Sequence, residues 1–294
     1  MEINKFFNSN SKIINNKIDF HKFLTEAKYS IDKKGYYLAK DFLEEEIYKT
    51  CREESINFFK KKSIIKKKLE ECLRGDVSAG MKDVIGFTKN KTWHLFRNCS
   101  FNWNQSNKEI NNIIATSRCL SKVRNILNDN HINYGESIEE DGYIAYTSLS
   151  LYPSEGGFLK EHNDGLEYNS QTTKQGKILH FKIELTHSGK DYKDGGFYIK
   201  DKETSKYVNL SEKSMPRDVI FFDGSQNHLI KNITGGVIGR IAFFQIPTYV
   251  SSCSRIGLYS GDGWSKPKIA FLILSNKLVF YCKRIAKKVI SFLN

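Results

Sequence analysis

A histidine and an aspartate stand two residues apart in the stretch FLKEHNDG, at positions 162 and 164. The stretch follows a run that alternates like a β-strand. Residues i and i+2 of an extended chain project to the same face, so His162 and Asp164 can present an imidazole and a carboxylate to one point. Because this spacing is common by chance, it indicates a metal site only if a third ligand lies on a neighbouring strand.

His228 is the candidate for that third ligand. It follows an apolar run at 219–222 and an Asp-Gly turn, and it begins a further strand-like run. Two imidazoles and one carboxylate form the facial triad that suits non-haem Fe(II), and this set leaves coordination positions open. The three residues therefore predict an iron site, with ordinary polar strand residues as the alternative interpretation.

Arg240 extends this group of residues. It lies twelve residues after His228, with Thr-Gly-Gly at 234–236 between them. Glycine tolerates positive φ, so the tripeptide predicts a hairpin that folds the Arg240 strand against the His228 strand. Diagonal neighbours on two such strands lie about 7–8 Å apart. A planar guanidinium at that distance suits the far carboxylate of a five-carbon dicarboxylate whose other end binds the metal.

The elements that must position these residues differ along the chain. Up to about residue 135 the chain reads mainly as helix, with a short strand-like GYYLA at 35–39 and a helix predicted to begin near Asp41. From Tyr143 the period changes to two, in short runs separated by Gly, Asp, Asn and Ser. Such runs predict a jelly roll. We therefore predict a helical flank at 1–135, a mainly β, cupin-like double-stranded β-helix core at 136–250 and a tail at 251–294.

The composition narrows the classes of protein. The chain has 294 residues, 39% apolar and 27% charged, with a formal net charge of +13. These values are typical of a globular protein, and the positive charge favours an anionic partner. No nucleic-acid-binding motif is present, so we expect no nucleic-acid partner. The six cysteines are scattered and no signal peptide is evident, which predicts reduced thiols in the cytoplasm.

The H-x-D…H…R arrangement on jelly-roll strands resembles the Fe(II)/2-oxoglutarate-dependent dioxygenase superfamily. The stretch KKGYYLAKDFLEEEIYKTCREE is similar to the opening strand and acidic helix of phytanoyl-CoA-dioxygenase-like members. The stretch LYPSEGGFLKEHND is similar to the approach to H-x-D in prolyl-hydroxylase-like members, where a tyrosine helps to bind 2-oxoglutarate. The resemblance covers roughly residues 34–60 and 143–247.

The resemblance implies a role for each residue. His162, Asp164 and His228 would hold Fe(II), Arg240 would bind the co-substrate 2-oxoglutarate, and Tyr152 would assist. The implied activity is that of a hydroxylase that uses dioxygen as a further co-substrate and releases succinate and CO₂. The expected substrate is an anionic small molecule, a saccharide or a lipid-linked compound. The alternatives are a non-redox cupin-type metal enzyme and a degenerate jelly-roll binding module.

Two positions refine the resemblance. Ala242 stands where many members carry Ser or Thr, so another hydroxyl must contact the distal carboxylate. Tyr152 fits this role better than Ser148 or Ser150. Asp164 is present where halogenating members have a small residue, which favours hydroxylation over halogenation.

A row of ionisable residues alternates within ILHFKIELT, where His180, Lys182 and Glu184 share one face of a predicted strand. The row has two interpretations, and both stay open. It either lines the barrel interior, with a role next to the substrate or the metal, or forms a solvated strand face.

The tail, KPKIAFLILSNKLVFYCKRIAKKVISFLN, carries apolar residues at helical spacing, with basic residues mostly away from them. Ser-Asn-Lys at 275–277 interrupts the apolar run, so it is shorter than the roughly 18 residues that a spanning helix needs. The pattern predicts a basic amphipathic helix that lies on an acidic membrane surface. The alternative is that the stripe packs on the barrel or in a dimer.

Overall fold

A computed structural model of the protein describes residues 2–61, 81–88, 91–102, 108–135, 143–164 and 179–249. Its helices are α1 (Glu2–Ser9), α2 (Phe20–Lys34), α3 (Glu45–Lys61), η1 (Lys108–Ile110, a 3₁₀ turn), α5 (Asn111–Leu127) and α8 (Leu210–Lys213). Its strands are β1 (Tyr36–Ala39), β2 (Met81–Thr88), β3 (Lys91–Asn102), β4 (Tyr143–Tyr152), β5 (Glu155–His162), β6 (Leu179–Glu184), β7 (Asp194–Lys200), β8 (Tyr207–Asn209), β9 (Val219–Asp223), β10 (His228–Thr234) and β11 (Arg240–Tyr249).

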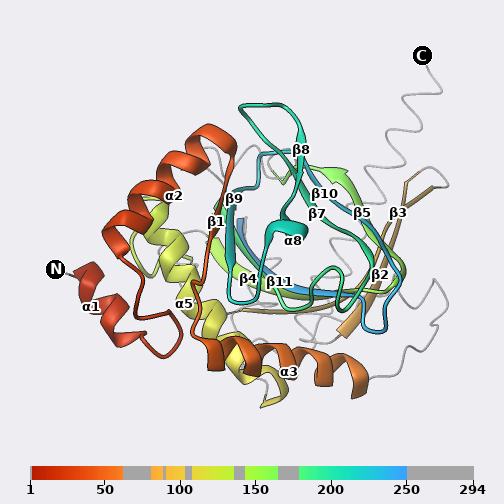
Figure 1. Cartoon of the computed structure of the whole chain (residues 1–294), viewed down its shortest axis with the longest axis horizontal. Coiled ribbons are helices and arrows are strands. Elements are labelled where there is room, and N and C mark those ends of the chain that lie inside the picture. The colour runs from red at the N-terminus through yellow and green to blue at the C-terminus, as the bar shows by residue number, and fades with distance from the viewer. Residues whose placement is uncertain are drawn as a thin grey trace, which may run out of the picture.

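These strands form one antiparallel hydrogen-bonded series that curves into a jelly roll (Figure 1). The order is β1-β9-β6-β11-β4-β3-β5-β10-β7-β8, with β2 paired to β3. One layer consists of β9, β6, β11 and β4, and the other consists of β5, β10 and β7. From β4 to β11 the long strands alternate between these two layers. Strand β3 pairs with both β4 and β5, so it joins the two layers. The predicted double-stranded β-helix is therefore confirmed.

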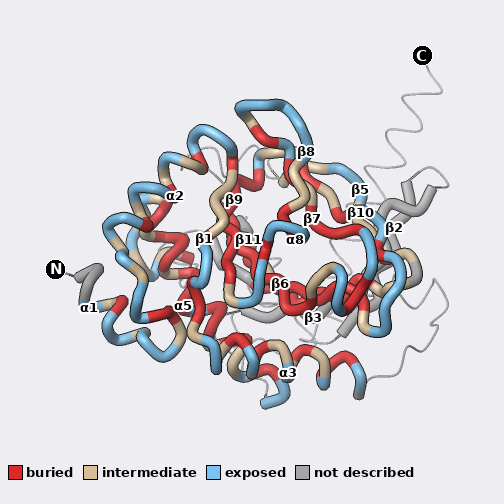
Figure 2. Tube along the Cα trace, viewed as in Figure 1, coloured by how far each residue is buried: buried red, intermediate tan, exposed pale blue. Residues whose placement is uncertain are grey.

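Strand β6 separates two hydrophobic cores and is buried along its whole length (Figure 2). Phe181 and Ile183 belong to the core that the sheet shares with α2, α3 and α5. Phe197 and Phe222 belong to a second core on the other side of the sheet, inside the barrel. Because side chains alternate along a strand, the even-numbered residues of β6 face this interior. Of the two interpretations of the His-Lys-Glu row, the structure therefore supports the interior one.

The N-terminal part supplies strands as well as helices. The predicted strand at 35–39 is present as β1, which pairs with β9. The helix predicted to begin near Asp41 begins instead at Glu45, so that prediction is wrong. Asp41 has a φ of 54° and pairs with Arg217 at 3.2 Å, and the buried Phe42 follows it. The chain is thus fixed to the barrel before the helix starts. Strands β1 to β3 all lie within the predicted flank, and its boundary at 135 stays a prediction.

The predicted turn at 234–236 is present, but its consequence differs from the expectation. Gly235 and Gly236 have φ values of 65° and 84°. Strand β10 pairs with β5 and β7, whereas β11 pairs with β4 and β6, so the predicted hairpin between β10 and β11 is wrong. The turn carries the chain from one layer to the other. His228 and Arg240 therefore come from different layers of the barrel.

No helix within the described ranges is long and apolar enough to cross a membrane. The predicted amphipathic tail at 251–294 lies outside the described residues.

Candidate active site

The three predicted metal ligands come together where β5 ends and β10 begins. His162 and His228 are direct cross-strand partners, and Asp164 follows β5 by two residues. His228 Nε2 lies 3.5 Å from Asp164 Oδ2, and His162 Nε2 lies 3.8 Å from Asp164 Oδ1. One potential ligand atom from each residue lies within 4.8 Å of the other two, and no other such group of three is found in the described part of the chain.

Backbone carbonyls orient both imidazoles. His162 Nδ1 lies 2.8 Å from the Lys160 carbonyl, and His228 Nδ1 lies 2.8 Å from the Gln226 carbonyl. A carbonyl only accepts hydrogen bonds, so each Nδ1 carries the proton and Nε2 is unprotonated, the form of the nitrogen that can bind a metal. Burial lowers the pKa of His228 well below its ordinary value, which keeps the ring neutral. Two imidazoles and one carboxylate fit Fe(II) as a donor set.

The loop that carries Asp164 is tied to the β9–β10 turn. The Asp164 backbone N–H donates to the Gly224 carbonyl at 2.8 Å, and Asn163 Nδ2 donates to Asn227 Oδ1 at 3.1 Å. The carboxylate is therefore positioned from the same turn that precedes His228, and the sheet fixes both sides of the group.

Arg240 lies inside the barrel and already has a carboxylate partner. Its Nη2 donates to Glu184 Oε1, and its Nε donates to Ser211 Oγ at 3.3 Å. Its guanidinium carbon lies 5.3 Å from the ring centroid of Tyr152, its cross-strand partner. Burial acts to lower the pKa of Arg240, but the neighbouring Glu184 carboxylate acts to raise it, and the net shift of the pKa is upward. This internal pair was not predicted, because β6 and β11 are far apart in the sequence.

Lys182 is the second cation of the interior. Its side chain is buried, and its Nζ lies 3.5 Å from the centroid of the Phe197 ring and 5.3 Å from that of Phe244. Among the described residues, no hydrogen bond or ion pair joins this ammonium group to a carboxylate. Burial, followed by the charge of Arg240, lowers its pKa well below the ordinary value. Arg240 thus forms a direct ion pair with Glu184, whereas the close contacts of the Lys182 amine in the described part of the chain are with aromatic rings.

The position that carries Ser or Thr in many oxygenases is a buried alanine here. Ala242 lies opposite Ser150 on β4 and opposite Glu184 on β6. Ser148 and Ser150 are also buried, with their hydroxyl oxygens 3.3 Å apart. Tyr152 lies nearer to Arg240 in register than either serine. That the Tyr152 hydroxyl, rather than that of either serine, contacts the distal carboxylate of a dicarboxylate stays a prediction.

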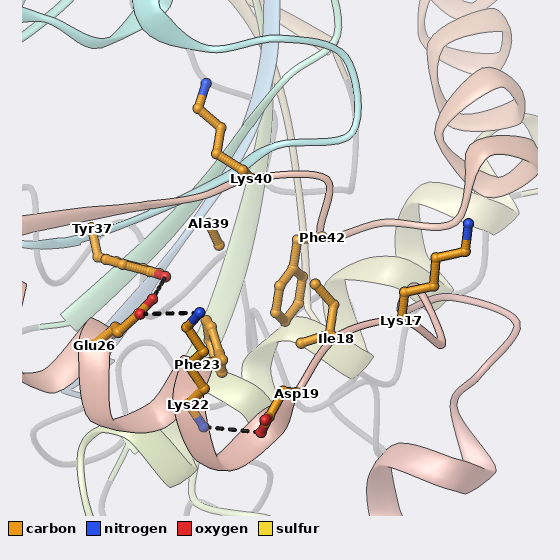
Figure 3. A pocket seen from close by; sticks show the side chains of 10 residues that line it. All are labelled: Lys17, Ile18, Asp19, Lys22, Phe23, Glu26, Tyr37, Ala39, Lys40 and Phe42. Carbon is orange, nitrogen blue, oxygen red and sulfur yellow. Dashed lines mark hydrogen bonds and ion pairs between the residues drawn. The ribbon is translucent and has the colours of Figure 1, made fainter.

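A separate hollow of about 250 Å³ lies on the outer surface by α2 and β1 (Figure 3). Its charged side chains are mostly partnered within the hollow. Lys22 Nζ lies 3.9 Å from Glu26 Oε1, and the Tyr37 hydroxyl donates to Glu26 Oε2 at 3.2 Å. Lys40 pairs instead with Asp218, outside the hollow, at 2.8 Å. None of these contacts points to a reaction.

The buried pair of Arg240 and Glu184 leads to a stability prediction. Glu184→Leu should lower the free energy of unfolding by about 3–5 kcal/mol, because Arg240 is then a buried cation without an anion. Chemical denaturation measures this loss. Lys22→Leu is the control, because it removes an exposed pair that contributes under about 1 kcal/mol. If Glu184→Leu lowered the free energy of unfolding as little as Lys22→Leu does, the burial of Arg240 would not depend on its pairing with Glu184.

The fold and this group of residues together define a class: a jelly roll with a His-x-Asp…His group that could hold a metal ion. No protein-family model and no curated protein sequence matches the chain. In structure, it is similar to a prolyl hydroxylase from Trichoplax adhaerens that was solved with a peptide fragment of the hypoxia inducible factor. The TM-score is 0.50 and the identity 12%, over 85% of this chain and 99% of that chain.

Two further solved structures are similar at lower scores. EctD from S. alaskensis, solved with 2-oxoglutarate and 5-hydroxyectoine, has a TM-score of 0.49 and 13% identity over 81% of each chain. A Pseudomonas putida prolyl-4-hydroxylase has a TM-score of 0.44 and 12% identity, over 78% of this chain and 100% of that chain. The similarity to the Trichoplax enzyme shows that this chain has the fold of the Fe(II)/2-oxoglutarate oxygenases. The resemblance inferred from the sequence is confirmed at this level.

Proposed function

We propose that the chain is a non-haem Fe(II)/2-oxoglutarate-dependent dioxygenase in which His162, Asp164 and His228 hold the ferrous ion. The convergence of these three side chains within 4.8 Å, in this fold, is the observation that carries the proposal. When bound, the ferrous ion supplies the redox chemistry with dioxygen. In the overall reaction one oxygen atom enters a substrate C–H bond. The other enters 2-oxoglutarate, which becomes succinate and CO₂.

The interior residues suit the second carboxylate of 2-oxoglutarate. Arg240 and the protonated form of Lys182 are two cations, and Glu184 is one anion, so together they carry one net positive charge. A distal carboxylate would neutralise that charge. We infer that Lys182 shares this carboxylate with Arg240, while Glu184 and the ring of Tyr152 hold the guanidinium in place.

The substrate proposal is an anionic small molecule, saccharide or lipid-linked compound, and the net charge of +13 supports it. The Trichoplax prolyl hydroxylase was solved with a peptide, but a shared fold does not choose a substrate for this chain. A screen of anionic and neutral metabolites, scored by succinate release, tests the proposal. Stimulation by neutral compounds alone would contradict it.

Anaerobic binding tests the assignment of function. The chain should bind one equivalent of Fe(II), and then one equivalent of 2-oxoglutarate only when the metal is present. A non-redox cupin-type enzyme would bind the metal without 2-oxoglutarate, and a degenerate binding module would bind neither. Either of these results would contradict the proposal and identify the alternative that replaces it.

The tail carries a further proposal, which rests on its sequence alone. The stripe of apolar residues flanked by lysine and arginine supports peripheral contact with an acidic membrane surface. Each basic residue near an anionic bilayer contributes about 1 kcal/mol, so binding should be strong at low salt and weak at high salt. Vesicle co-sedimentation of the full chain, compared with a chain that ends at Ser265, measures this. A full chain that stays in the supernatant at low salt would contradict the proposal.

A further inference from the structure

His180 is a buried histidine whose ring nitrogens lack partners. It lies on β6, its exposed fraction is 0%, and its ring centroid is 4.9 Å from that of Phe222. Neither Nδ1 nor Nε2 forms a hydrogen bond with any described residue. Buried polar atoms are nearly always hydrogen-bonded, so an imidazole in this state requires an explanation.

The nearest acceptor for His180 is the metal-binding carboxylate. Its Nε2 lies 3.6 Å from Asp164 Oδ2, just beyond hydrogen-bonding distance. Atoms of Asp164, His162 and His228 lie within 4.8 Å of one another, and His180 does not join that group. His180 therefore faces the carboxylate without sharing the point on which the three ligands converge.

Gly224 makes the approach of His180 possible. A Cβ atom on Gly224 would lie 2.2 Å from His180 Nε2 and 2.8 Å from its Cδ2, so no other residue fits there without moving the ring. The carbonyl of the same glycine accepts the hydrogen bond from the Asp164 N–H at 2.8 Å. One residue thus holds the Asp164 backbone and leaves room for the imidazole beside the Asp164 side chain.

We propose that His180 is a positioning residue for the metal site, with its Nε2–H donating to Oδ2 of Asp164. A carboxylate only accepts hydrogen bonds, so the ring nitrogen that faces it must carry the proton. With Oδ2 held by His180, the other oxygen of Asp164 would be the one that binds the metal. His180 would thus fix the orientation of the carboxylate toward the metal site. This inference rests on the proposed metal site.

The affinity for Mn(II), measured by calorimetry on the full chain, tests the role. Partners of metal ligands typically contribute about 10–100-fold to metal affinity, so His180→Phe should weaken Mn(II) binding by that factor. It should also change the visible absorption spectrum of the Co(II)-loaded protein. Gly224→Ala should have the same two effects, because the added methyl group displaces the imidazole. His180→Gln should recover most of the affinity, because its amide N–H can donate.

His187→Phe is the control, since it removes a half-buried imidazole away from the metal site. The His187 Nε2 lies 2.6 Å from the hydroxyl of Tyr48, and this contact is not part of the metal site. The variant should lose stability and keep its Mn(II) affinity. If His180→Phe does not fold, the Mn(II) affinity of Gly224→Ala tests the role of His180 instead. Wild-type affinity in both variants would overturn the role of His180 and leave the metal site intact. A wild-type chain that binds neither Mn(II) nor Co(II) would instead overturn the proposed function.

Discussion

His228→Ala should lose stoichiometric binding of ferrous ion and all turnover, while the barrel stays folded. The ligand lies at the start of β10, and its Nε2 is 3.5 Å from the Asp164 carboxylate, so its removal leaves two ligands of three. Iron content after gel filtration and calorimetric titration measure the loss. His131→Ala, which changes an exposed histidine, is the control and should bind iron as the wild type does. Stoichiometric iron in His228→Ala would contradict the assignment of the triad.

Asp164→Gly should also lose hydroxylation, for a related reason. The substitution opens a coordination position and removes the only anionic side chain of the triad. Metal affinity should therefore fall as well as turnover. An Asp164→Gly variant that retains both would show that the carboxylate is not a ligand.

Lys182→Met should raise the Kd of the Mn(II)-loaded protein for 2-oxoglutarate by about 10²-fold, because a buried charge-assisted pair contributes a few kcal/mol. Methionine is an unbranched side chain of similar length, so it removes the amine that lies over the Phe197 ring and keeps an apolar chain in its place. The control ligand is 2-oxovalerate, a five-carbon 2-oxo acid without the second carboxylate. Its affinity should be the same in both proteins. If 2-oxoglutarate binds equally well to wild type and Lys182→Met, Lys182 does not contact the distal carboxylate.

Arg240→Ala should also weaken 2-oxoglutarate binding by about 10²-fold, and Arg240→Lys should rescue it only partly because the bidentate fork is lost. Arg240→Ala, however, leaves Glu184 as a buried carboxylate without its cation. The free energy of unfolding must therefore be measured together with the Kd. This dependence makes Lys182→Met the cleaner variant.

Binding of 2-oxoglutarate beside Lys182 should be accompanied by uptake of a proton. Burial keeps the pKa of Lys182 low; the charge of Arg240 lowers it further, whereas Glu184 and Asp164 act to raise it. The charge of Lys182 also contributes to the lowered pKa of His228 and of His180. The distal carboxylate of bound 2-oxoglutarate would raise the pKa of Lys182, so binding of 2-oxoglutarate takes up a proton. The affinity for 2-oxoglutarate should therefore fall as pH rises from the pKa of Lys182 in the free protein to its pKa in the complex. Calorimetry in buffers of different ionisation enthalpy should show this uptake in wild type and none in Lys182→Met.

Local sequence was sufficient to predict which two histidines and which aspartate come together. The spacing of His162 and Asp164 follows from the two-residue period of a strand, and the change of period at Tyr143 predicts the jelly roll. The structure brings these residues together with His228 as predicted. Their role as iron ligands remains a proposal.

The remaining features depend on contacts between distant segments. The glycines at 235 and 236 indicate a turn, but local turn chemistry does not distinguish a hairpin from a crossing between layers. Glu184 becomes the partner of Arg240 only because β6 lies beside β11. Gly224 is explained by its packing against His180, although its Asp-Gly sequence indicated only a turn.

Incorporation of labelled oxygen tests the proposed function most directly. The Fe(II)-loaded chain should be incubated with 2-oxoglutarate under ¹⁸O₂, and the succinate examined by mass spectrometry, with His228→Ala as the background. An active dioxygenase transfers one atom of the dioxygen to the succinate carboxylate, so we predict succinate with one ¹⁸O atom that His228→Ala does not form. Succinate that is unlabelled, or no more abundant than in His228→Ala, would contradict a 2-oxoglutarate-dependent dioxygenase.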